Sequence, residues 1–190
     1  MLKLRLPQSG FTLIEVLTTI AVMGVLMALA APSFFEFMQN AQIRTAADAM
    51  QSGLQAARGA AIARNRPVQI TIGPGSGWTV TEVPIAPAVI GTGLETRVHE
   101  ESTPNVTVNT TPAGAIMITF SALGAVIPNA NTVTQMDFVN ASGGACQTAS
   151  GPMRCLRVLV TAGGSIRMCD PKFDPAPTPP TPRDARACPP

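Results

Sequence analysis

The chain begins with a short charged segment that continues into a long apolar run. Residues 1–10 carry Lys3 and Arg5 and no acidic residue, and residues 11–31 contain Glu15 as their one ionisable side chain. At about 1.5 Å per residue, a helix over the run is about 30 Å long, which matches the hydrocarbon thickness of a bilayer. The pattern therefore predicts a membrane-spanning helix whose basic end stays in the cytoplasm.

After Pro32 the apolar residues recur at helical spacing. They form one stripe that steps by four and three residues: Ile43, Ala47, Met50, Leu54, Ala57 and Ala61. The helix is expected to end at Asn65-Arg66-Pro67, because the residue before a proline is disfavoured in helical conformation. One helix over residues 11–64 is therefore predicted, with an apolar first half and an amphipathic second half that packs on a head.

From residue 67 onward the pattern changes to short alternating segments separated by turn residues. Such segments predict β-strands, and they fall at residues 67–72, 78–83, 96–100, 105–109, 115–120, 133–139, 155–161 and 164–168. The connections at residues 84–95 and 140–153 are expected to be the longest and least ordered. Six or more short strands after one helix predict an α+β fold, with the helix packed on an antiparallel β head of one or two sheets.

The last residues differ again in composition. Residues 171–190 hold eight of the 18 prolines, which predicts an extended, polyproline-like tail. The expected organisation is a leader, a membrane helix, an amphipathic stem, a β-rich head and a tail, over residues 1–10, 11–32, 33–64, 65–170 and 171–190 respectively.

Composition argues against catalysis and against binding of nucleic acid by bulk charge. Apolar residues make up 46% and charged residues 13%, and the net charge of +2 comes from the first ten residues. His99 is the one histidine, which leaves no spare for an acid–histidine–nucleophile set. Glu100 and Glu101 are adjacent, so on a strand they point to opposite faces. Neither an enzyme nor a cofactor is expected.

Four cysteines lie in the part of the chain expected outside the cytoplasm, which favours disulfides. Cys146, Cys155, Cys169 and Cys188 include no C-x₂-C pair, and His99 is remote, so no metal site is expected. Cys155 and Cys169 are placed symmetrically about the turn between the last two predicted strands, which predicts a bridge between them. That pairing leaves Cys146 for Cys188, although four cysteines allow three connectivities.

The N-terminus admits two interpretations that differ in where the chain is cleaved. An ordinary secretory signal peptide would be cut at the small-x-small site Ala28-Leu29-Ala30 and would leave a secreted β-rich domain. Glu15 argues against that interpretation, because a carboxylate at membrane depth is costly and is usually kept for a functional partner.

The segment Gly10-Phe11-Thr12-Leu13-Ile14-Glu15 resembles the processing motif of type IV pilins and type II secretion pseudopilins. The resemblance implies that a prepilin peptidase cuts after Gly10 and methylates Phe11. It also implies that Glu15 pairs with the N-terminal amine of a neighbouring subunit, in keeping with the need of a buried carboxylate for a cation. Pro32 matches a proline that loosens the helix in pilin stems.

The segment ARNRPVQI after the helix resembles the GspH/FimT branch of minor pilins and pseudopilins, as do the β-rich head and the late glycine turn. The branch implies a structural subunit that assembles through its N-terminal helix into a type IV pilus or a type II secretion pseudopilus, at the tip or in initiation. Its implied partners are other pilins or pseudopilins, the prepilin peptidase and the inner-membrane assembly platform. A single pass through the inner membrane would place the head in the periplasm.

DNA capture at a pilus tip for natural transformation is the alternative function. In the resembling branch the late hairpin often carries Gly-Arg-x-Arg, and here Gly164-Ser165-Ile166-Arg167 keeps one arginine of the two. The candidate contacts are Arg167, Lys172, Arg183 and Arg186. Because one charge is missing and acidic residues interleave, any DNA binding is expected to be weak and salt-sensitive. An ordinary solvated surface is the other interpretation of these residues.

Overall fold

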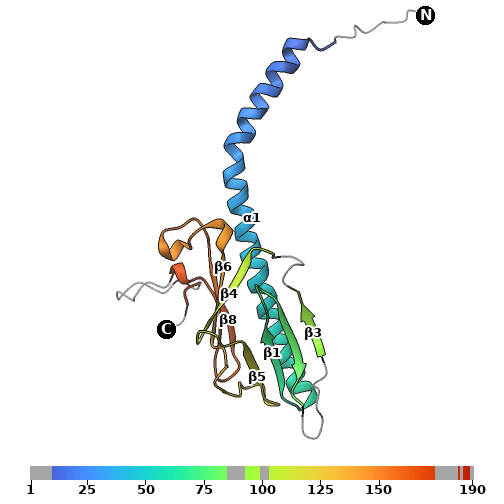
Figure 1. The fold of residues 1–190 in the computed structure, drawn as a ribbon, viewed down its shortest axis with the longest axis vertical. Coiled ribbons are helices and arrows are strands. Elements are labelled where there is room, and N and C mark those ends of the chain that lie inside the picture. Colours follow the sequence, from blue (N-terminus) through green and yellow to red (C-terminus); the bar gives the residue numbers. More distant parts are fainter. Residues whose placement is uncertain (1–9, 85–92, 99–102, 174–183, 185, 189–190) are drawn as a thin grey trace, which may run out of the picture. The chain divides into compact units, whose positions relative to one another are not determined.

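The computed structural model describes residues 10–84, 93–98, 103–173, 184 and 186–188 (Figure 1). The chain divides into two compact units, residues 1–37 and residues 38–190. The first unit contains the apolar part of one long helix. The second contains the remainder of that helix and all eight strands found in the described residues.

The helix α1 runs from Leu13 to Arg64 and continues through Pro32. Its end forms a Schellman motif, in which the Arg66 N–H donates to the Ala61 carbonyl at 3.2 Å and the Asn65 N–H to the Ile62 carbonyl at 3.3 Å. Asn65 takes the left-handed conformation of that motif, with φ of 51°. The predicted helix and its end are confirmed, whereas the loosening of the helix at Pro32 stays a prediction.

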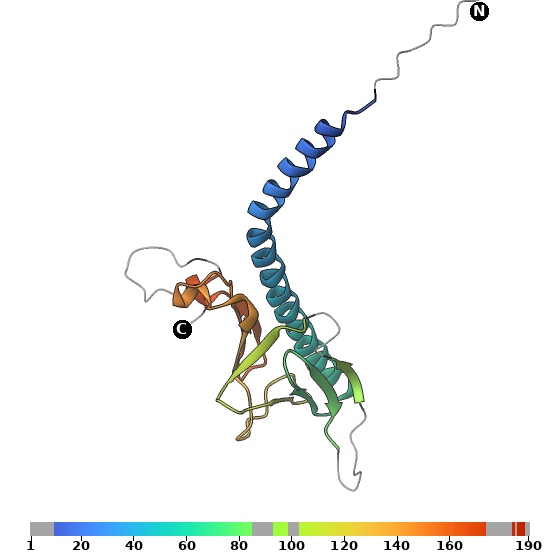
Figure 2. The ribbon, with the colours of Figure 1, turned by 45° about the horizontal axis from the view of Figure 1, so that its top comes forward.

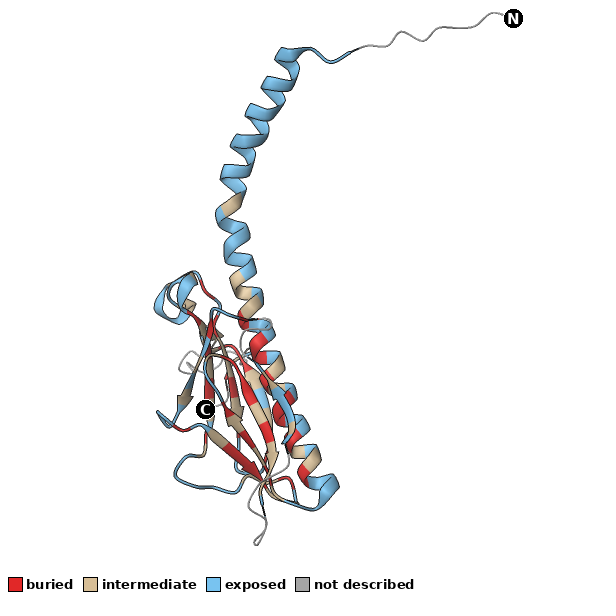
Figure 3. Cartoon of the chain, turned by 45° about the vertical axis from the view of Figure 1, so that its right-hand side comes forward, coloured by how far each residue is buried: buried red, intermediate tan, exposed pale blue. Residues whose placement is uncertain are grey.

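Within the head, α1 buries one face against the strands (Figure 3). Its buried residues are Ile43, Ala46, Ala47, Met50, Gly53, Leu54, Ala57 and Ala61. All six residues of the predicted stripe are among them, each with no exposed surface. Most of these side chains are small, so the sheets approach the helix closely.

The first sheet is antiparallel, with strand order β3-β2-β1-β5. Its strands are β1 (Val68–Ile72), β2 (Trp78–Glu82), β3 (Gly93–Arg97) and β5 (Met117–Phe120). Ile70 lies opposite both Val80 and Ile118, and all three are buried. Since side chains alternate along a strand, this register turns one apolar face of the sheet toward α1.

The second sheet is also antiparallel, with strand order β4-β6-β7-β8. Its strands are β4 (Val106–Thr111), β6 (Gln135–Asn140), β7 (Leu156–Val160) and β8 (Ile166–Cys169). In β6 the buried residues Met136, Phe138 and Asn140 alternate with half-buried ones. The other face therefore carries polar side chains such as Asp137 and Arg157, which lie opposite each other.

One hydrophobic core unites α1 with both sheets. Leu54 of α1, Phe120 of β5 and Phe138 of β6 all belong to it and have no exposed surface. Figure 2 shows strands of both sheets beside the second half of α1. The expected α+β fold is confirmed, and the head contains two sheets rather than one.

All eight predicted strands are present, with ends that differ by a few residues. The largest shift concerns β3, which begins at Gly93 inside the expected 84–95 connection, because Arg97 pairs with Trp78. His99, Glu100 and Glu101 lie outside the described residues.

Two segments are more regular than their composition predicted. The 140–153 connection contains two 3-10 helices, η2 (Ala141–Gly143) and η3 (Gln147–Ala149). The tail begins with a third, η4 (Pro171–Phe173), where an extended chain was expected. In both cases a buried side chain organises the turn: Asn140 accepts from the Ser142 N–H at 3.1 Å, and Asp170 accepts from the Lys172 N–H at 3.0 Å.

Candidate functional site

The start of α1 is set by Thr12. The Thr12 hydroxyl oxygen accepts a hydrogen bond from the Glu15 backbone N–H at 3.3 Å, and the Thr12 carbonyl accepts one from Val16 N–H at 3.3 Å. Thr12 is thus the N-cap, at the T-x-x-E spacing of a capping box. Gly10 and Phe11 therefore precede the helix, and both are exposed.

Glu15 lies in the first turn of α1 and its side chain is exposed. The N–H groups of a first turn lack partners within the helix, and the helix dipole places partial positive charge there. An acidic residue is therefore well placed at this position of a helix. Glu15 forms no ion pair with the residues that the structure describes.

The helix that follows Glu15 presents apolar side chains in every direction. It is long and apolar enough to cross a membrane by length and composition, and none of its most apolar stretch is buried. Leu17, Ile20 and Leu29 expose between 56% and 74% of their surfaces. Such a continuous apolar surface needs apolar surroundings, which a bilayer or neighbouring helices can provide.

All four cysteines form disulfides, which confirms that part of the prediction, but the predicted pairing is wrong. The bonds are Cys146–Cys155 and Cys169–Cys188, with Cα–Cα distances of 5.5 and 5.0 Å. In the sheet, Cys169 lies opposite Arg157 rather than Cys155, because the β7–β8 loop is centred one residue later than expected. Cys155, which directly precedes β7, therefore lies two residues before the position opposite Cys169.

The second disulfide holds the end of the chain against β8. The Asp170 N–H donates to the Arg186 carbonyl at 2.8 Å, beside the Cys169–Cys188 bond. Cys188 itself is buried. Cys188 thus ties the tail to the head through Cys169, and not through Cys146 as predicted.

The candidate DNA contacts are less available than their sequence suggests. Arg186 donates to the Asp184 carboxylate at 2.9 Å and stacks on Phe173, 4.1 Å from the ring centroid. The hydrogen bond from the Arg186 side chain is the main cause that lowers the pKa of Asp184 to about 2. The two charges of this pair therefore offset each other throughout the physiological pH range.

The other three candidate contacts have different surroundings. Lys172 is exposed, with its ammonium 6.0 Å from the Phe173 ring centroid. Arg167 is exposed on β8 and forms no ion pair with the residues that the structure describes. Arg183 lies outside the described residues.

Acidic residues from other elements neutralise much of the basic charge that clusters in the sequence. Salt bridges join Arg64 to Glu82, Arg154 to Asp170 and Arg157 to Asp137, each at 2.6 Å. Glu82 and Asp137 are far along the chain from their partners, so sequence spacing carries no signal for these pairs. The described residues also hold no group of three His, Cys, Asp or Glu side chains suited to a metal ion.

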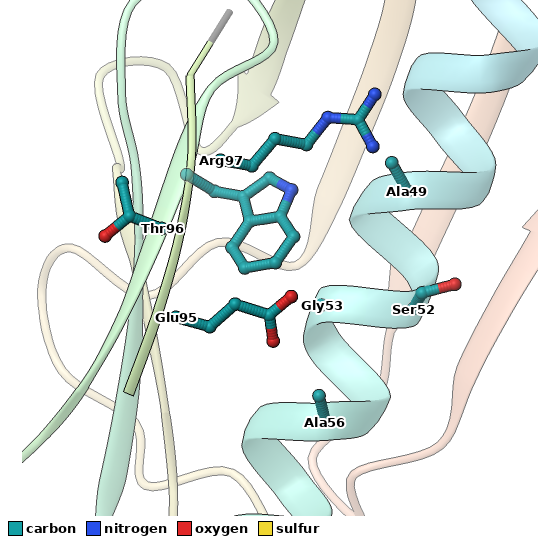
Figure 4. Close-up of a pocket in the computed structure, with 8 residues that line it drawn as sticks. Ala49, Ser52, Gly53, Ala56, Glu95, Thr96 and Arg97 are labelled. Carbon is teal, nitrogen blue, oxygen red and sulfur yellow. The ribbon is translucent and has the colours of Figure 1, made fainter. Parts of the chain in front are cut away.

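Sequence reasoning missed a groove of about 630 Å³ between α1 and β3 (Figure 4). Its lining residues are Ala49, Ser52, Gly53, Ala56, Trp78, Glu95, Thr96 and Arg97. Glu95 and Arg97 extend from β3 toward α1. The Trp78 side chain is 4% exposed, and its indole N–H has no hydrogen-bond partner among the described residues. Gly53 is the sequence signal, since a Cβ there would lie 2.6 Å from Trp78 Cζ2.

Two protein-family models match the chain. The prokaryotic N-terminal methylation motif matches residues 5–31, which include the capped helix start and Glu15. The model for type II transport protein GspH matches residues 46–169, which is more than half of the chain. The chain belongs to the GspH family of pilin-like proteins. The GspH match ends at Cys169, so the tail and its disulfide partner Cys188 lie beyond the family model.

Solved structures that match this chain include those of two proteins, FimU and GspH. The type IV minor pilin FimU of Pseudomonas aeruginosa PAO1 matches with a TM-score of 0.51 and 19% identity, over 70% of this chain and 91% of FimU. Escherichia coli GspH matches with a TM-score of 0.47 and 16% identity, over 73% of this chain and 94% of GspH. The likeness to FimU shows a shared fold. No curated protein matches the chain.

Proposed function

We propose that this GspH-family chain is a minor pilin or pseudopilin that is cleaved after Gly10, methylated at Phe11 and inserted into a filament through α1. It is a structural subunit without a catalytic role. The observation that supports the proposal best is the helix start, where an accessible Gly10–Phe11 bond precedes a capped helix with Glu15 in its first turn. The exposed apolar surface of α1 after Glu15 also supports the proposal.

In the proposed assembly, Glu15 acts as a docking charge. Cleavage after Gly10 creates a cationic amine at Phe11, one residue before the N-cap. In an apolar environment an uncompensated charge is costly, so the amine of one subunit and the carboxylate of a neighbour stabilise each other. The apolar side chains of residues 13–31 then pack against those of neighbouring helices in place of lipid.

The proposed partners are other pilins or pseudopilins, the prepilin peptidase and the inner-membrane assembly platform. Before assembly the chain would cross the inner membrane once, with its head in the periplasm. We further propose a position at the tip or in initiation of the filament. The machine is either a type IV pilus or a type II secretion pseudopilus, and crosslinking to the pilins of one or the other would assign it.

Mass spectrometry of the membrane-extracted protein tests the processing step. We expect the mature chain to begin at Phe11 and to carry one methyl group on its amine. Gly10→Leu should retain the leader, because a side chain at the cleaved bond obstructs the peptidase. Gly24→Ala serves as the control, since a Cβ at Gly24 meets no atom within 4 Å. A mature N-terminus at Ala31 would instead identify an ordinary signal peptide.

The second candidate function, DNA binding, has one observation in its favour: Arg167 is exposed and forms no ion pair with described residues. Phosphate contacts need only accessible cations on one face. Arg167 and Lys172 supply two, while Arg186 and Arg154 are paired with Asp184 and Asp170. We therefore propose weak, sequence-independent binding at most.

Titration of the detergent-solubilised chain into labelled duplex DNA at two salt concentrations measures this binding. The expected dissociation constant lies in the non-specific range of ~10⁻⁴–10⁻⁶ M and weakens as salt rises. Arg167→Gln should weaken it most. Arg44→Gln is the control, because that exposed arginine is paired with Asp48 on α1. Tight binding that resists salt would contradict the assignment of a mainly structural role.

A further inference from the structure

An aromatic patch follows the apolar run on α1. It consists of Phe34, Phe35 and Phe37, three of the seven phenylalanines of the chain, with 61%, 62% and 69% of their surfaces exposed. At about 100° per helical residue, they cover about 160° of the circumference of α1. The polar residues of the same turn, Ser33 and Glu36, fall on the other side. This turn is therefore amphipathic, unlike the uniformly apolar helix before it.

The position of the patch along the helix corresponds to the thickness of a bilayer. Phe34 and Phe37 lie about 28 and 33 Å beyond Glu15 at 1.5 Å per residue. The hydrocarbon core of a bilayer is about 30 Å thick. When the patch lies at one boundary of the core, Glu15 therefore lies at the opposite boundary, where water and headgroups can solvate a carboxylate.

We propose that Phe34, Phe35 and Phe37 bind the boundary between headgroups and acyl chains on the outer side of the inner membrane, and so set the depth of α1 before assembly. This proposal rests on the proposed function, because it requires α1 to span the membrane. Amphipathic helices bury aromatic side chains at the boundary between headgroups and acyl chains and keep their polar side chains in water. Because the aromatic patch directly follows the apolar run, it reaches this interfacial layer when the run crosses the bilayer.

In this arrangement Glu15 has a defined depth in the membrane before assembly. With the patch at the outer boundary, the carboxylate stays near the cytoplasmic boundary, where the cost of a charge is lower than at the centre of the bilayer. Without the patch, the apolar stretch ends at Ala31 and its midpoint lies near Ala21. With the patch, the midpoint lies near Gly24, about 4.5 Å further along the helix.

A spin label at the midpoint tests this depth. The full-length chain carrying Gly24→Cys, labelled with a nitroxide, is reconstituted alone into liposomes, so that no other pilin covers the helix. A Cβ at Gly24 meets no atom within 4 Å, and the native cysteines are all in disulfides. Oxygen and nickel-chelate accessibility should place this label near the bilayer centre. In Phe34→Ser/Phe35→Ser/Phe37→Ser, the label should move about 5 Å toward the outer face.

A control variant and liposome flotation show whether the patch, the membrane anchor or both fail. Ile62→Ser/Leu123→Ser is the control, because it removes two side chains in the head that are 50% and 89% exposed, and it should leave the label where it was. A chain that floats with liposomes and keeps its label depth in the triple variant overturns the role of the patch but retains the proposed membrane anchor. A chain that does not float with liposomes overturns both.

Discussion

Replacing Glu15 with alanine should leave processing after Gly10 intact and should reduce incorporation into the filament at least about tenfold. Processing survives because the N-cap bond uses the Glu15 backbone N–H and the Thr12 side chain, which the substitution leaves in place. Incorporation falls because the amine of the neighbouring subunit loses its counter-charge in an apolar environment. Removal of one partner of a buried ion pair costs about 3–5 kcal/mol, and about 1.4 kcal/mol is a factor of ten.

Crosslinking to partner pilins in membranes and in sheared filaments measures the Glu15 effect. Glu36→Ala is the matched control: Glu36 is an exposed carboxylate on the same helix, but it lies beyond the apolar run. The control should assemble normally. If Glu15→Ala and the wild-type protein enter the filament equally well, Glu15 is not the docking charge.

Gly53→Ala should destabilise the head, by about 1–3 kcal/mol. An added Cβ would lie 2.6 Å from Trp78 Cζ2 and 2.8 Å from Cε2 and Cη2, so the indole or the helix must move. Overpacking of this kind typically costs a protein core about 1–3 kcal/mol. Trp78 is almost fully buried, which leaves its ring little room to yield.

Gly59→Ala is the matched control for Gly53→Ala. Gly59 lies in the same helix, but a Cβ there meets no atom within 4 Å. Alanine favours a helix over glycine by about 1 kcal/mol, so this variant should be more stable than the unchanged chain. Urea unfolding, monitored by circular dichroism, compares the stabilities of Gly53→Ala and Gly59→Ala. Equal unfolding midpoints would show that α1 does not need glycine for close packing against Trp78.

The elements that local pattern specifies were predictable. The buried stripe of α1 was predicted because residues of equal polarity repeat with the helical period, and the helix end because Asn65 and Pro67 stop a helix by their own conformational preferences. The strands were predicted for the same kind of reason, since alternation of apolar and polar residues is a property of each segment alone. The helix start at Thr12 also follows from four neighbouring residues.

The sequence by itself thus determined the long helix, its apolar and amphipathic halves, the eight strands and the Gly10–Glu15 motif. Tertiary structure decided which distant segments meet. A shift of one residue in the centre of the β7–β8 loop places Arg157 opposite Cys169, and this changes both disulfides. The pairing of Arg157 with Asp137 and the contact of Gly53 with Trp78 likewise depend on strand register and on how α1 packs. These contacts result from the balance of many packing interactions across the whole head, so no short segment of the chain contains the information that specifies them.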